Sequence, residues 1–91
     1  MQTKEKRESL IEEIWKRSGL DYVSDMVYIT NCYTVLYAVK QLPARSYSEE
    51  QWERLYEYLF CESGEGKHKA DILEVLLLFS DFRYHLGRWG R

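Results

Sequence analysis

The run from Tyr22 to Leu42 constrains this chain most, because Asp25 and Lys40 are its only charged side chains. Two apolar stripes at helical spacing cross it. A helix that is apolar on two sides needs cover on two sides, so the run predicts a helix at the centre of a bundle. The stripes are Tyr22, Met26, Ile29, Tyr33 and Leu36, and Tyr28, Cys32, Val35, Val39 and Leu42.

A buried strand is the alternative for this run, because Val, Ile, Thr and Tyr also favour pleated surfaces. The apolar positions do not alternate with polar ones, however, which favours the helix. A membrane span is not expected. The charge-free core from Met26 to Val39 contains polar residues and is shorter than the ~20 apolar residues that cross a bilayer.

Amphipathic helices are predicted on both sides of this central run. The first covers Thr3 to Ser18, and Gly19 suits the left-handed position past its end. Pro43 ends the central helix because it disfavours helical geometry in the preceding residue. Ser48 then opens a third helix. Its spacing to Gln51 is that of a capping box, and Tyr47 and Trp52 have the spacing of a hydrophobic staple.

A last helix is predicted from about Lys69 to Leu86, with Gly87 as its stop. Its apolar run Val75–Phe79 indicates deep burial. With 45% hydrophobic residues in a chain of 91, the sequence predicts one all-α domain over residues 1–91. We expect a compact four-helix domain with its second and fourth helices buried and residues 87–91 as a loose tail. One side of the last helix is expected to carry Ile72, Val75, Phe79, Phe82 and Leu86, and the adjacent side Leu73, Leu76, Leu77 and Tyr84.

Catalytic and cofactor motifs are weak in this sequence. Glu53 and Glu57 have the spacing of a carboxylate pair, but they belong to a predicted solvent face. Gly66-Lys67 lacks the earlier glycine and the following Ser or Thr of a phosphate loop. We therefore expect neither enzyme activity nor a cofactor. A small metal-binding protein is a minor alternative, because Cys32, Cys61, His68 and His85 could form a zinc shell, although their spacings match no compact ligand pair.

Charge is distributed unevenly although the formal net charge is only −2. The segment 49–65 holds six acidic residues and Arg54, whereas the segment 83–91 holds three arginines and His85 without an acid. Arginines mixed with aromatic rings can grip phosphate and stack on bases. A nucleic-acid-binding protein that uses this C-terminal tail is therefore the main alternative function, although the same side chains also suit a helix C-terminus.

Eight tyrosines and three tryptophans are many for this length, and such residues are enriched in protein interfaces. The leading hypothesis is a protein-binding module: an adaptor or a stoichiometric inhibitor of a larger partner, including the kind that phages and mobile elements direct at host systems. A homodimer is also expected. With two separated cysteines and no signal-peptide pattern, a cytoplasmic location is expected. The candidate partner-binding residues are Tyr28, Tyr37, Trp52, Arg83, His85, Arg88, Trp89 and Arg91.

Overall fold

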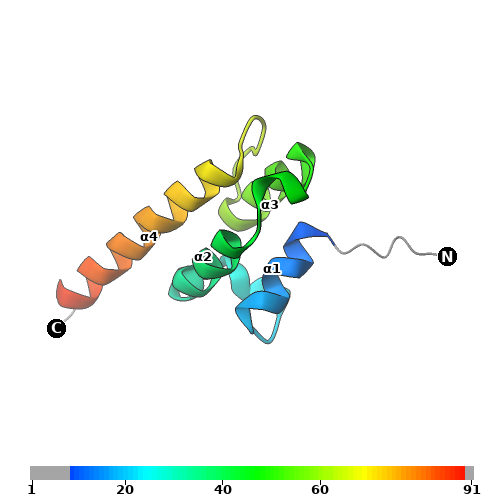
Figure 1. The fold of residues 1–91 in the computed structure, drawn as a ribbon. Coiled ribbons are helices and arrows are strands. Elements are labelled where there is room, and N and C mark those ends of the chain that lie inside the picture. The colour runs from blue at the N-terminus through cyan, green and yellow to red at the C-terminus, as the bar shows by residue number, and fades with distance from the viewer. Residues whose placement is uncertain (1–8, 90–91) are drawn as a thin grey trace.

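A computed structural model of the chain describes residues 9–89, with the side chains of residues 9–81. The described part is all-α and contains no strand, which confirms the predicted class (Figure 1). It has four α-helices, with two short 3₁₀ segments between the first and second and one between the second and third. The α-helices are α1 (Leu10–Ser18), α2 (Cys32–Gln41), α3 (Glu49–Phe60) and α4 (Lys69–Trp89), and the 3₁₀ segments are η1 (Val23–Val27), η2 (Ile29–Asn31) and η3 (Ala44–Ser46).

The central run is not one continuous helix, and this part of the prediction was wrong. Tyr28 is extended, with φ −80° and ψ 134°, and it separates η1 from η2, so α2 begins only at Cys32. Local polar side chains explain the break. The Asp25 carboxylate accepts the backbone N–H of Tyr22 at 3.2 Å, and the Asn31 amide donates to the Asp25 carbonyl at 2.8 Å. Such bonds offer the backbone an alternative to helical pairing.

The predicted helix ends at Gly19, Pro43 and Ser48 are confirmed. Gly19 is left-handed with φ 74°, and Leu42 before Pro43 is extended. The Ser48 hydroxyl accepts the N–H of Gln51 at 3.3 Å, which caps α3. The rings of Tyr47 and Trp52 meet edge to face, 6.1 Å apart. The expected stop at Gly87 is wrong because α4 continues to Trp89, so residues 87–89 are helical rather than a loose tail.

One predicted contact has a different partner. The Gln51 side chain was expected to return to the cap of its own helix, as in a capping box. Instead, its Oε1 accepts the backbone N–H of Leu10 at 2.7 Å. The bond joins the start of α1 to the first turn of α3 and satisfies a donor that α1 cannot pair internally.

The core lies where α1, α2, α3 and the first half of α4 meet. The central position predicted for α2 is confirmed, since five of its ten residues are buried. The largest fully buried side chains come from all four helices: Leu10, Ile14, Leu55, Ile72, Val35 and Val39. Burial of each of these side chains contributes about 1.5–3 kcal/mol of hydrophobic stabilisation.

Helix α4 runs antiparallel to α2 and is about twice as long. Two contacts mark the ends of their pairing: the Lys69 ammonium donates to the Leu42 carbonyl at 2.6 Å, and Cys32 Sγ lies 3.3 Å from Ser80 Oγ. Since Cys32 is the first residue of α2 and lies against Ser80, the last turns of α4 extend past the start of α2. Figure 1 shows this half of α4 standing clear of the other helices.

The turn between α3 and α4 is held by two glutamates of α3. The carboxylate of Glu57 accepts the backbone N–H of Gly64 at 3.1 Å, and that of Glu53 accepts the N–H of Gly66 at 3.0 Å. Gly64 is buried so closely against α3 that a Cβ there would lie 2.1 Å from the Glu53 carbonyl oxygen. These two acids therefore have a structural task rather than forming only a solvated face.

The close approach at Gly64 leads to a paired prediction. Gly64→Ala should lower the free energy of unfolding by about 3 kcal/mol, because the new methyl group must push backbone away. Gly66→Ala is the matched control. Its φ of 77° strains an alanine, but nothing lies within 4 Å of the new atom, so the loss should be about 1–2 kcal/mol. Urea unfolding followed by circular dichroism measures both values, and equal losses would contradict the close approach.

Candidate protein-binding surface

Large exposed hydrophobic side chains are concentrated in two short runs. Of the nine such residues, five lie between residues 27 and 37 and three are consecutive on α4. The ninth is Tyr22, which lies apart from both runs. The full set is Tyr22, Val27, Tyr28, Ile29, Tyr33, Tyr37, Leu77, Leu78 and Phe79. Clustered exposure of this kind marks an interaction surface more often than scattered exposure does.

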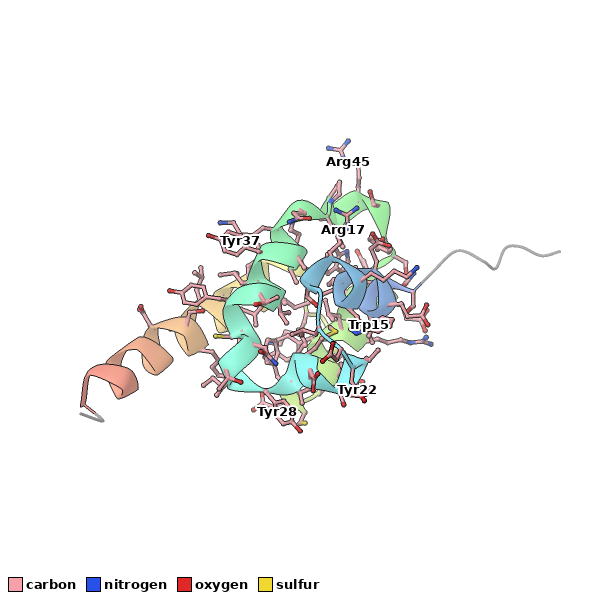
Figure 2. The ribbon with its side chains drawn as sticks, turned by 90° about the horizontal axis from the view of Figure 1, so that it is seen from below. Trp15, Arg17, Tyr22, Tyr28, Tyr37 and Arg45 are labelled. Carbon is pink, nitrogen blue, oxygen red and sulfur yellow. The ribbon has the colours of Figure 1, made fainter. Side chains whose placement is uncertain are left out.

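The first surface is formed by Tyr33 and Tyr37, which we call the tyrosine face. The two residues are one helical turn apart on α2, and their exposed fractions are 50% and 64%. Val35 and Val39 turn to the opposite side of the helix and are fully buried. Figure 2 shows Tyr37 directed away from the body of the domain. Lys40 is the only charged residue of α2, so a partner can cover the tyrosine face at little desolvation cost.

The second surface is a small apolar hollow beside η1 and η2. Met26, Cys32, Leu59 and Leu76 contribute buried side chains to it, and Val27, Tyr28, Ile29, Phe60 and Phe79 complete its lining. We call it the η-hollow. The Phe60 and Phe79 rings meet edge to face with centroids 5.6 Å apart, which connects α3 to the middle of α4.

The structure separates the aromatic residues that the sequence singled out. Tyr28 and Tyr37 are exposed but lie apart, since Tyr28 precedes η2 and Tyr37 belongs to the second half of α2 (Figure 2). Trp52 is inside the domain with 2% of its surface exposed, and its indole N–H donates to the Ala44 carbonyl at 2.9 Å. In this conformation Trp52 supports the core and offers no surface to a partner.

The basic tail is placed only in part. Arg83, His85, Arg88 and Trp89 belong to the last turns of α4, but their side chains lie outside the described ones, and Arg91 lies outside the described residues. Their expected role in binding therefore stays a prediction.

Tyr33, Leu77 and Leu78 are among the exposed residues that sequence reasoning missed. Tyr33 was expected in an apolar stripe of the central helix, and Leu77 and Leu78 in a buried run of the last one. Tyr33 is half exposed because it stands on the side of α2 opposite Val35 and Val39, which the neighbouring helices bury. Leu77 and Leu78 are 55% and 60% exposed because α2 covers one side of α4 only.

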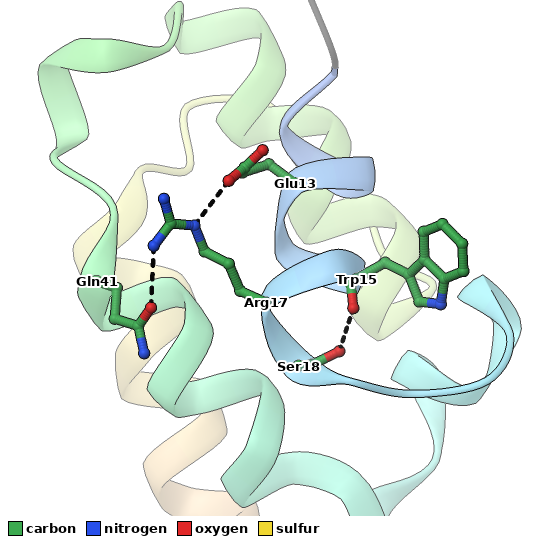
Figure 3. Close-up of polar contacts among 5 residues, drawn as sticks. All are labelled: Glu13, Trp15, Arg17, Ser18 and Gln41. Atoms are coloured by element: carbon green, nitrogen blue, oxygen red, sulfur yellow. Dashed lines mark hydrogen bonds and ion pairs between the residues drawn. The ribbon is translucent and has the colours of Figure 1, made fainter.

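The polar contacts of Arg17 and Ser18 join parts of the domain to one another. Arg17 donates from Nε to Glu13 at 2.7 Å and from a terminal nitrogen to the Gln41 side-chain oxygen at 3.0 Å, which ties α1 to the end of α2 (Figure 3). The Ser18 hydroxyl donates to the Trp15 carbonyl at 2.7 Å. Exposed pairs of this type contribute little stability.

The structure was also searched for metal-binding clusters. Over residues 9–81, no three His, Cys, Asp or Glu side chains come together in a way that could hold a metal ion. Cys32 is buried and Cys61 exposed, and both are free thiols. None of the described helices combines the length and the apolar character that a membrane crossing requires.

Comparison of the chain with family models, with curated proteins and with solved structures gives no match. A functional interpretation must therefore come from the surfaces described above.

The two tryptophans of the domain body allow a test of the core assignment. The buried Trp15 Nε1 finds no hydrogen-bond partner among the described residues, whereas that of Trp52 is bonded. Trp15→Phe removes an unsatisfied donor, but Trp52→Phe breaks a hydrogen bond. Trp52→Phe should therefore cost about 2 kcal/mol more in unfolding free energy. Equal costs in thermal or urea unfolding would contradict a structural role for the Trp52 N–H.

Proposed function

We propose that this chain is a small protein-binding module that acts as an adaptor or a stoichiometric inhibitor of a larger protein. The tyrosine face is the contact surface. The observation that carries the proposal is the exposure of two adjacent tyrosine rings on an α-helix whose other side forms the core.

Rigid presentation supports this role. Tyr33 and Tyr37 stand on the most buried helix of the domain, so their backbone is already ordered before a partner arrives. Tyrosine provides a large contact area with only two side-chain torsions, which keeps the entropic cost of binding low. The phenol oxygen adds a hydrogen-bonding group at the rim of an otherwise apolar contact.

The surroundings of the tyrosine face also fit a protein partner better than a small molecule. The pair protrudes on a convex helix surface, whereas small-molecule sites are concave and enclose most of their ligand. The adjacent Lys40 and Gln41 are exposed and provide a polar rim. A central aromatic anchor with a polar edge is the usual anatomy of a protein interface.

The test begins with the full chain as bait, followed by purification of the captured protein and titration with variants. The double variant Tyr33→Ala/Tyr37→Ala should weaken binding by roughly 10- to 100-fold, as truncation of interface anchors does. Tyr22→Ala is the matched control, because Tyr22 is 70% exposed but lies outside the η2–α2 segment. Its affinity should equal that of the unmodified chain.

Two outcomes would overturn the proposal. The first is equal affinity of the double variant and the control. The second is binding that weakens steeply with salt and disappears when the chain is truncated after Leu86, which would support the nucleic-acid alternative through the tail instead.

A further inference from the structure

Helix α4 carries a second apolar side that its own domain does not cover. Ile72, Leu76 and Ser80 recur every four residues and are buried. On one flank of this stripe lie Val75, Leu78 and Phe79, which we call the α4 seam. Val75 is half-buried, Phe79 is 37% exposed and Leu78 is 60% exposed. Phe79 also lines the η-hollow, so the seam and the hollow form one continuous apolar surface.

The seam leads toward the C-terminal part of α4, which extends beyond the other helices. At 1.5 Å per residue, the 21 residues of α4 span about 31 Å, whereas the ten residues of α2 span about 15 Å. The nine residues 81–89 continue beyond Ser80, which among the described side chains is the last of α4 to bond to α2. Most of the stability of a helix in a protein comes from packing of its apolar face, so this extension gains from an element that packs against it.

The sequence of the extension continues the rhythm of the seam. Phe82 and Trp89 follow Val75 at intervals of seven, and Leu86 follows Phe79 at the same interval. Apolar residues repeated every seven positions are typical of helices that pair with another helix. The partner of α4 is therefore expected to be a helix rather than an extended segment or a small molecule.

The distribution of charge along α4 favours a second copy of the same helix as its partner. Residues 69–81 hold Lys69 and three acids, Asp71, Glu74 and Asp81, a net charge of +1 − 3 = −2. Residues 82–89 hold two arginines and no acid, a net charge of +2 with histidine neutral. The two halves of α4 are thus complementary in sign. An antiparallel copy places each basic half beside the acidic half of its partner, whereas a parallel copy places like charges together.

We infer that two copies of the chain pair through antiparallel α4 helices, with their crossing at Leu78 and Phe79. The two-fold arrangement lays the extension of each copy along the first half of the partner's α4 and over the partner's η-hollow. It buries the same surface on both copies, as an isologous contact requires. The tyrosine face belongs to α2 and is not part of this contact, so the inference is independent of the proposed function.

Two neighbouring leucines provide a matched test. Leu77 and Leu78 are similarly exposed, but consecutive helix positions differ in direction by about 100°, so only Leu78 lies on the seam. Sedimentation equilibrium of the full chain should give twice the chain mass. Leu78→Glu should weaken the dimer by roughly a hundredfold, because it places carboxylates against each other in an apolar contact. Leu77→Glu should remain dimeric.

Circular dichroism shows whether each variant is still folded, so that loss of the dimer is not confused with unfolding. Both leucines are exposed, so both variants should retain the helical signal of the unmodified chain. A monomeric unmodified chain, or equal effects of Leu77→Glu and Leu78→Glu on a folded domain, would overturn the inference. The variant Tyr33→Ala/Tyr37→Ala should leave the dimer intact, and loss of the dimer in that variant would also contradict it.

Disulfide trapping tests the antiparallel direction. In a Cys61→Ser background, chains with Val75→Cys and chains with Phe82→Cys should cross-link when mixed under mild oxidation, since both positions follow the seam and lie at equal distances on either side of the crossing. Val75→Cys alone should not cross-link. Self-cross-linking of Val75→Cys without a mixed product would show a parallel pair and overturn the proposed direction.

Discussion

The packing of α2 against the first half of α4 is the contact on which the rest of the domain depends. Helix α2 buries residues toward α1 on one side and toward α4 on the other, so no other helix touches as much of the core. The contact has a fixed length because α2 has only ten residues. Because α2 is short, α4 extends beyond its support. The Tyr33 and Tyr37 rings remain outside because they stand on the side of α2 opposite the buried Val35 and Val39.

Much of the fold could be predicted because the decisive signals are local. Ser48, Gly19 and Pro43 each act within one or two turns of backbone, and all three helix boundaries that they predict are confirmed. The all-α class follows from the helical spacing of apolar residues, and this spacing needs no knowledge of tertiary contacts.

The errors arose where a tertiary or side-chain contact overrides the apolar pattern. Asp25 and Asn31 bond to nearby backbone and break the central run, although the apolar stripes continue through it. The Gln51 side chain accepts the N–H of Leu10 on α1 instead of bonding at the cap of its own helix. Trp52 has the residue type of an interface anchor, but its position opposite the Ala44 carbonyl places it inside. The exposed side of α4 could not be identified, because a uniform run of leucines does not show which of them a neighbouring helix will cover.

The buried pair of Cys32 and Ser80 makes the α2–α4 contact directly observable. Cys32 is 2% exposed and lies against Ser80, so its thiol meets a reagent only when the side chains packed around it move apart. The Cys61 thiol stands outside and reacts without any opening, so every molecule contains its own reference. The ratio of the two labelling rates therefore reports how often the centre of the domain opens under native conditions.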